Sequence, residues 1–137
     1  MKLASRERYS YRTSVADKTE IRWLSEPEEH SYPAAESYLS LVHDGPAATK
    51  LVGKLRRAPV STFKAKDIFR ASGLSLLGVS NAHVTKDQRK IREGKRLSPL
   101  LLVRDEAHGK VVIADGYHRM CAVYSFDEDA DIPCKIV

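Results

Sequence analysis

Apolar side chains recur at helical spacing in two stretches of the first half of the chain. Over residues 33–42 and 46–56 they fall on one face of an α-helix, at Ala34, Tyr38, Leu41 and Val42 and then at Ala48, Leu51, Val52 and Leu55. Between the two stretches, Asp44 is suited to cap a helix and Pro46 to occupy its first turn. The pattern predicts two short helices joined as a hairpin.

The pattern changes after Pro59, where short apolar runs separated by turn residues replace the helical periodicity. Runs rich in Val, Ile and Leu predict strands. Thr85 and Gln88 have the spacing of a capping box and predict the start of a helix that Gly94 ends. The expected elements are strands over residues 60–65, 99–103, 110–114 and 132–137, a single helical turn over 67–70, and helices over 85–93 and 117–126.

These elements predict an α+β fold, a small mixed sheet flanked by helices. A chain of 137 residues is long enough for one core and too short for two ordinary ones. We therefore expect one folded unit with three parts. Residues 1–20 are polar and are expected to form a flexible arm, residues 21–58 a helical extension, and residues 59–137 the α+β domain.

The composition of the chain does not favour a membrane-spanning or a secreted protein. No window approaches the roughly 18 uninterrupted apolar residues that a membrane helix needs, and the polar N-terminus lacks the apolar core of a secretory signal. We therefore expect a cytoplasmic protein without a membrane partner. The two cysteines, Cys121 and Cys134, form no Cys-x-x-Cys pair and are expected to be buried, reduced thiols. The net charge of +5 favours anionic partners, and basic residues concentrate over residues 86–96.

The sequence Asp115-Gly-Tyr-His-Arg119 stands where a predicted strand turns at once into a predicted helix. The first turn of a helix leaves N–H groups unpaired at the positive end of its dipole, and anions bind such places. Gly116 permits close approach, Arg119 offers a planar fork of donors, and His118 offers one more. The motif predicts a phosphate site on Gly116, His118 and Arg119.

Residues 97–103, 111–122 and 132–137 together resemble the ParB/sulfiredoxin superfamily, and the resemblance covers residues 60–137. It is most specific at Gly116-x-x-Arg119-x-x-Ala122. In ParB-type domains this pattern surrounds the phosphates of a bound nucleotide. The resemblance therefore implies a ParB/sulfiredoxin-like fold in which Gly116, Tyr117, His118, Arg119 and Ala122 form a nucleotide-phosphate site.

Variation within the superfamily bears on the expected activity. Sulfiredoxin carries Gly-Cys-His-Arg in this loop, and Tyr117 stands at the position of its redox cysteine, so reduction of a sulfinic acid is not expected. The free-serine kinases of the superfamily carry Asp-Gly-His-His-Arg, which is closer to the present motif and keeps phosphoryl transfer open. With the last predicted strand over residues 132–137, we do not expect the helix-turn-helix of partition proteins.

The basic helix expected over residues 85–93 corresponds to an element that adds basic nucleotide contacts in these relatives. Lys86 and Lys90, with Arg89 as an alternative, are the candidates, although a run of this kind is also typical of a solvated helix face. A kinase needs a carboxylate to hold magnesium or to orient the acceptor hydroxyl. Asp115 is the catalytic candidate, and Asp87 and Glu93 are the alternatives.

Two hypotheses for function follow. The first is a nucleotide-phosphate-binding protein that uses a nucleoside di- or triphosphate (ATP, ADP or CTP) with Mg²⁺ as a phosphotransferase or NTPase. The second is a non-catalytic module of the same fold that binds DNA or a protein partner. Dependence of affinity on salt separates them, because counterion release dominates binding to nucleic acid.

Overall fold

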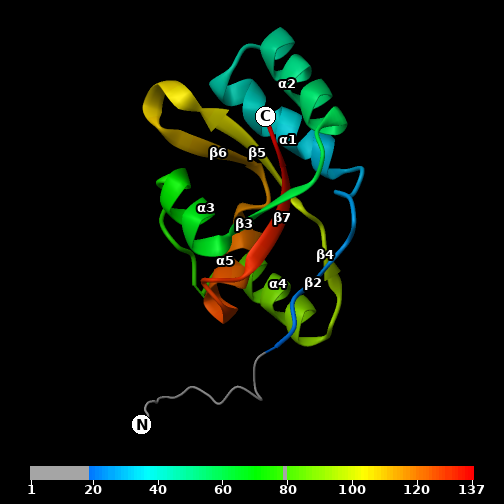
Figure 1. Ribbon diagram of the computed structural model, residues 1–137, viewed down its shortest axis with the longest axis vertical. Helices are drawn as coiled ribbons and strands as arrows, with labels where there is room; N and C mark the ends of the chain where they lie inside the picture. Colours follow the sequence, from blue (N-terminus) through cyan, green and yellow to red (C-terminus); the bar gives the residue numbers. More distant parts are fainter. Residues whose placement is uncertain (1–18, 79) are drawn as a thin grey trace.

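The computed structural model describes residues 19–78 and 80–137. Within them the chain is α+β, with five α-helices, a four-stranded mixed sheet and a second sheet of two short strands (Figure 1). The predicted fold class is confirmed at this level. The arm predicted over residues 1–20 lies almost wholly outside the described residues. No helix in the described ranges is both long and apolar enough to cross a membrane.

The predicted helical hairpin is confirmed, but the apolar face predicted for its first helix is wrong. Tyr38, Leu41 and Val42 are exposed, and the helix instead buries Tyr32, Ala35 and Leu39. The hairpin consists of α1 (Ser31–Val42) and α2 (Gly45–Arg57). Asp44 caps α2, since its Oδ1 accepts a hydrogen bond from the Ala47 N–H at 2.8 Å, and a proline lies in the first turn as expected.

The main sheet has the strand order β3-β7-β5-β6. Its strands are β3 (Ser61–Lys64), β5 (Leu100–Asp105), β6 (Lys110–Asp115) and β7 (Asp131–Ile136). β5 and β6 form an antiparallel hairpin through the short 3-10 helix η2 (Glu106–His108). The last strand, β7, lies parallel to β5 and antiparallel to β3, so it joins the two halves of the sheet.

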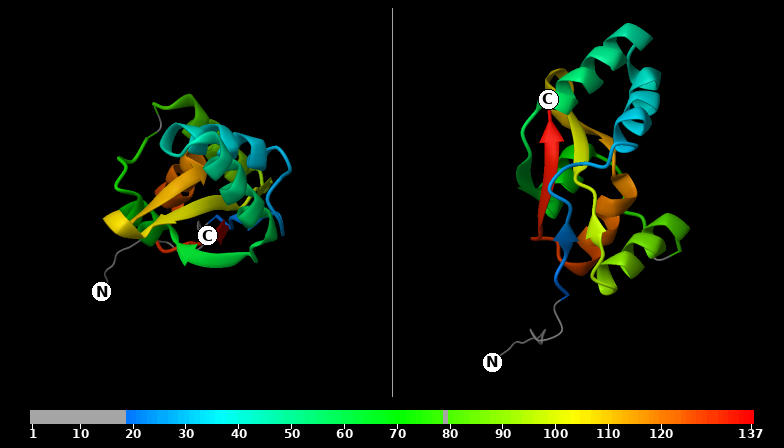
Figure 2. Two further views of the ribbon diagram at one scale, coloured as in Figure 1. Left: turned by 90° about the horizontal axis from the view of Figure 1, so that it is seen from above. Right: turned by 90° about the vertical axis from the view of Figure 1, so that its right-hand side faces the viewer.

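Both faces of this sheet are covered, as the burial of β5 shows. Leu100 and Leu102 belong to a core cluster with residues of α3 (Ala65–Ser72) and α5 (Tyr117–Phe126), whereas Leu101 and Val103 belong to a second cluster with residues of α1 and α2 (Figure 2). Alternate residues of a strand point to opposite faces. A continuous apolar run is therefore expected of a strand buried on both sides.

Two helix predictions were wrong. The predicted single turn is the start of α3, a helix of eight residues. The helix predicted over residues 85–93 is α4 (Ala82–Arg92), which begins three residues earlier because Asn81 caps it by accepting hydrogen bonds from the N–H groups of His83 and Val84. Gln88 takes no part in a capping box, since it is buried and its Nε2 donates to Ser125 Oγ at 2.9 Å.

Contacts distant in sequence tie residues 21–58 to the rest of the chain. β2 (Arg22–Trp23) and β4 (Arg96–Leu97) form the two-stranded parallel sheet, which the sequence did not predict. Lys135 of β7 is only 4% exposed, donates to the Arg56 carbonyl oxygen at 2.9 Å and pairs with Glu26 at 3.2 Å. The helical hairpin is thus held against the sheet by packing and by a buried lysine.

Candidate functional site

The candidate site begins where β6 ends and α5 starts. Gly116 is the N-cap of α5 and has a φ of 111°, in the left-handed region that glycine adopts most readily. A Cβ atom at this position would lie 2.6 Å from Leu100 Cγ and 2.9 Å from Arg119 Nη2. Both the backbone conformation and the close packing therefore require glycine here.

The first turn of α5 contains three of the predicted phosphate-site residues, Tyr117, His118 and Arg119. Gly116, the N-cap of this helix, has no side chain to offer, and no other side chain of the described residues caps it. The N-terminal N–H groups of a helix need acceptors from outside it, and the helix dipole favours negative charge at this end. The turn consequently has the local geometry of an anion-binding helix start.

Arg119 is held by Asp115. Its Nη2 donates to Asp115 Oδ2 at 2.8 Å, and both side chains are only 18% exposed. The Nε atom of Arg119 is buried, with no hydrogen-bond partner in residues 19–78 and 80–137. A buried donor without a partner is unfavourable by about 1–3 kcal/mol. Asp115 thus positions the guanidinium over Gly116, and the guanidinium retains donor capacity.

A hollow of about 200 Å³ opens in front of this turn. One wall is the β6–α5 turn from Asp115 to Arg119, and the other is α4, which contributes His83, Lys86, Asp87 and Lys90. Helices α4 and α5 pack against each other, which fixes the two walls. The structure therefore brings the predicted residues Lys86 and Lys90 to the same hollow as the motif.

The α4 residues share one helix face because they are three, four and seven positions apart from His83. His83 was missed by the sequence interpretation, which began the helix at Thr85. Recognition of Asn81 as the cap would have placed His83 in the first turn, on the face of Lys86 and Lys90. Arg89, the alternative basic candidate, is exposed and does not line the hollow.

Three rings that line the hollow lie close together. The His118 ring centroid lies 4.8 Å from that of His83 and 5.6 Å from that of Tyr117. The Tyr117 hydroxyl donates to the Ser75 carbonyl oxygen, which fixes the ring. Burial lowers the pKa of His118, and the neighbouring His83 lowers it further, against the opposing effect of Asp87. His118 is therefore biased toward its neutral form, which has one donor and one acceptor.

Asp87 contributes a carboxylate to the same hollow. Burial raises its pKa, although Arg119, Lys90, His118 and Lys86 all act in the opposite direction. A carboxyl group that resists ionisation among basic groups is suited to exchange a proton with a reacting hydroxyl. Asp115 is less free for that task because it is bound to Arg119.

Two other candidates lie away from the hollow. Ala122 is fully buried and packs in the core cluster of α5 and the sheet, so its small side chain serves helix packing. Glu93 pairs with Lys95 at 3.3 Å.

Cys121 and Cys134 are both buried, as expected, and burial raises their pKa values, that of Cys134 to about 11. Neither thiol has the low pKa of a reactive cysteine.

The hollow contains carboxylate groups of the kind that bind Mg²⁺ together with a phosphate ligand. Mg²⁺ is commonly held by one or two carboxylates together with substrate phosphates, and Asp87 and Asp115 both line the hollow. No group of three or more His, Cys, Asp and Glu side chains in the described ranges could hold a metal ion by itself. A metal at this site would depend on the oxygen atoms of the ligand.

Comparison of the chain with protein-family models, with curated proteins and with solved structures gives no match. The resemblance to the ParB/sulfiredoxin superfamily stays a prediction from residues of the motif. Function is therefore inferred from the geometry of the hollow.

Proposed function

We propose that this protein binds a nucleoside di- or triphosphate (ATP, ADP or CTP) with the phosphates in the hollow between α4 and α5, and that it uses the nucleotide for phosphoryl transfer or hydrolysis. The convergence of two separate segments supports this most directly. Lys86 and Lys90 of α4 and Arg119 of α5 line one hollow at an uncapped helix start. Three cations at such a start suit a group with several negative charges.

In this proposal each wall has a distinct task. The Gly116 turn and the start of α5 hold one phosphate through N–H groups, and Arg119 adds charge-assisted hydrogen bonds in an orientation set by Asp115. Lys86 and Lys90 face the phosphates from α4. Two or three such bonds, each contributing about 1.5–3 kcal/mol, are sufficient for micromolar affinity.

The chemical step assigns roles to the remaining polar groups. The acceptor hydroxyl, or a water molecule, attacks the terminal phosphorus; its new O–P bond forms as the P–O bond to the leaving phosphate breaks. The proton of the attacking group passes to Asp87, whose raised pKa suits it as a base, while neutral His118 donates a hydrogen bond to a phosphoryl oxygen. With Asp87 as the base, Mg²⁺ would be held by Asp115 together with phosphate oxygens and would neutralise phosphate charge. Asp115, the catalytic candidate of the sequence, becomes mainly a positioning residue.

Calorimetric titration with ATP, ADP, CTP and GTP, each with Mg²⁺, tests the proposal alongside a phosphate-release assay. Lys90→Ala and Arg119→Ala are expected to weaken binding by about tenfold or more. The matched control is Arg89→Ala, which removes a neighbouring exposed cation of α4 that does not line the hollow. Absence of binding to any nucleotide, or equal losses in Lys90→Ala and Arg89→Ala, would contradict the proposal.

A nucleic-acid-binding module is the second candidate, because α4 also carries basic residues outside the hollow. Arg89 and Arg92 are exposed in its last turn, and the chain has a net charge of +5. Binding to DNA through such residues would weaken steeply as salt rises, since each neutralised phosphate releases counterions. Saturable, strongly salt-dependent binding of duplex DNA that is lost in Arg89→Ala would favour this candidate. A protein partner on the same surface is the remaining alternative.

A further inference from the structure

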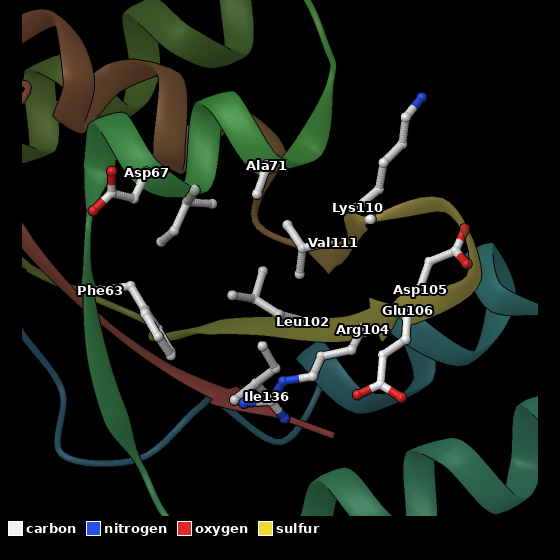
Figure 3. Close-up of a pocket in the computed structure, with 12 residues that line it drawn as sticks. Phe63, Asp67, Ala71, Leu102, Arg104, Asp105, Glu106, Lys110, Val111 and Ile136 are labelled. Atoms are coloured by element: carbon white, nitrogen blue, oxygen red, sulfur yellow. The ribbon is translucent and has the colours of Figure 1, made fainter.

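A second pocket of about 330 Å³ lies between α3 and the β5–β6 hairpin (Figure 3). Its walls and floor are apolar and come from five elements, at Phe63, Ile68, Ala71, Leu102, Val111 and Ile136. It contains Lys110 at the first residue of β6, whereas the charged hollow contains Asp115 at the last. At about 3.3 Å per residue the two sites are roughly 17 Å apart.

The pocket exists because α3 is short. The helix ends at Ser72, and Gly73 follows with a φ of 67°, which turns the chain away from the sheet. The apolar face of the sheet continues beyond this point, with Leu102 and Val111 beneath it. Phe63, at 38% exposed, forms one side (Figure 3). This is an open apolar site of the kind that takes a small ligand, and its volume is near the lower end of the usual range.

Arg104 marks the charged end of this pocket. In the alternation of β5 it follows Leu100 and Leu102 on the face toward α3, where an apolar residue is expected. Its side chain makes no hydrogen bond or ion pair with any residue of the described ranges. Figure 3 shows the guanidinium beside Ile136 at the edge of the pocket. Arg104 itself is exposed, and its guanidinium at the edge of the pocket has no side-chain partner among the described residues.

A free carboxylate accompanies it, that of Glu106, which also lacks an ion-pair partner among the described residues. The other two acids of the rim are engaged, Asp67 with an arginine at 3.4 Å and Asp105 with a histidine at 2.9 Å. Lys110 extends away from the apolar floor (Figure 3). One cation and one anion, not paired with each other, thus stand at one end of an apolar pocket.

We propose that this pocket binds a small apolar amino acid as its zwitterion. The apolar side chain of the ligand occupies the space between Ile68, Leu102 and Phe63, its carboxylate pairs with Arg104, and its ammonium group pairs with Glu106. A ligand that carries both charges satisfies both groups, whereas a purely anionic ligand is repelled by Glu106 and a purely cationic one by Arg104. The site is independent of the nucleotide hollow.

Titration of the isotope-labelled full chain with L-phenylalanine, followed by amide chemical shifts, tests this inference. We expect saturable shifts around Phe63, Ala71 and Arg104, with a dissociation constant at or below about 1 mM and saturation by about 10 mM. Two analogues supply the comparison, 3-phenylpropionate without the ammonium group and phenethylamine without the carboxylate. Each is expected to bind about tenfold or more weakly.

Variants separate the charge contacts from the apolar ones. Arg104→Gln and Glu106→Gln are both expected to weaken L-phenylalanine binding about tenfold, and Ala71→Leu to abolish it by filling the pocket. Arg89→Gln, an exposed arginine of α4, is the control and is expected to leave the affinity unchanged. No saturable shift by about 10 mM, or binding of 3-phenylpropionate as tight as that of L-phenylalanine, would overturn the inference. Nucleotide binding by the same variants is expected to be unaffected, so failure here is distinguishable from failure of the nucleotide proposal.

Discussion

The two ends of β6 differ in what surrounds them. At Asp115 the strand runs through a single glycine into α5, and the space in front of it is lined by charged and imidazole groups of two helices. At Lys110 the strand begins at a hairpin that extends past α3, and the space beside it is lined mainly by apolar side chains. One hollow is polar because it contains a helix start, and the other is apolar because a helix stops short of the sheet it covers.

Close packing at Gly116 therefore determines the geometry of the charged hollow, whereas the apolar pocket exists because packing there is incomplete. Gly116 is pressed between Leu100 and Arg119, so the charged hollow depends on an exact fit at the turn. The apolar pocket tolerates changes in its neighbours because part of its lining already faces open space. Substitutions at the two ends are therefore expected to have unequal effects.

The largest effect is expected from Gly116→Ala. The added Cβ would lie 2.6 Å from Leu100 Cγ, and the φ of 111° is unfavourable for alanine, so we expect a loss of about 2–5 kcal/mol in the free energy of unfolding. Gly94→Ala is the matched control, since Gly94 has a φ of 72° but no atom within 4 Å of the added Cβ. Its expected loss is about 1–2 kcal/mol. Urea denaturation of both variants measures the difference, and equal losses would show that packing at Gly116 is unimportant.

A smaller loss is expected from Ile68→Ala at the other end of β6. Ile68 is 4% exposed and borders the apolar pocket, so truncation is expected to reduce the free energy of unfolding by about 2 kcal/mol, the low end of the range for such changes. Ile132→Ala is the comparison, because Ile132 is fully buried in the same core cluster and does not line the pocket. We expect that loss to approach about 4 kcal/mol. Thermal and urea unfolding would contradict this comparison if Ile68→Ala were the more damaging.

The next effect is a dependence of stability on pH that comes from Asp87. Because burial raises the pKa of Asp87 in the folded state, its contribution to stability is present below the unfolded pKa and is lost as pH rises through the folded pKa. Asp87→Asn removes this loss, so the variant should gain stability relative to the wild-type chain as pH rises into the neutral range, by less than about 1 kcal/mol. Urea midpoints measured across the acid to neutral range test this. A stability difference that does not vary with pH would count against the assignment.

The smallest change in stability is expected from Lys90→Ala. Lys90 is partly exposed, makes no ion pair within the described part of the chain, and lies in the last turn of α4, so its removal should alter the free energy of unfolding by less than about 0.5 kcal/mol. Phosphate release by the Lys90→Ala variant with ATP and Mg²⁺ should nevertheless be about tenfold or more slower than that of Arg89→Ala. Equal phosphate release by the two variants would contradict the proposal that α4 contacts the nucleotide phosphates.

Local signals in the sequence predict much of this fold. Asp44 and Pro46 locate the start of α2, and Gly116 locates the start of α5, because caps and turns depend on a few neighbouring residues. The pairing of β2 with β4 was not predictable in this way, since each strand has only two residues and the contact joins positions far apart in the chain. The same holds for β7, whose place between β3 and β5 follows from the packing of the whole sheet.

Some residues of the candidate site were likewise predictable from local sequence, and others were not. Gly116, Tyr117, His118 and Arg119 were predicted from one continuous motif, and the structure brings Lys86 and Lys90 to the same hollow. His83 was missed because the capping-box spacing of Thr85 competed with the true cap, Asn81. The pairing of Asp115 with Arg119 spans only four residues, yet it depends on how the turn folds, which the spacing alone does not determine.

An amide chemical-shift titration of the isotope-labelled chain with ATP and Mg²⁺ shows whether α4 and α5 bind a nucleotide phosphate together. We predict saturable shifts confined to the two walls of the hollow, residues 115–119 and the α4 face of His83, Lys86, Asp87 and Lys90, with the residues around the apolar pocket unchanged. Arg119→Ala should require about tenfold or more ATP to reach the same saturation of these shifts. Saturable shifts elsewhere in the chain, or none in the hollow, would contradict the claim that α4 and α5 together bind a nucleotide phosphate.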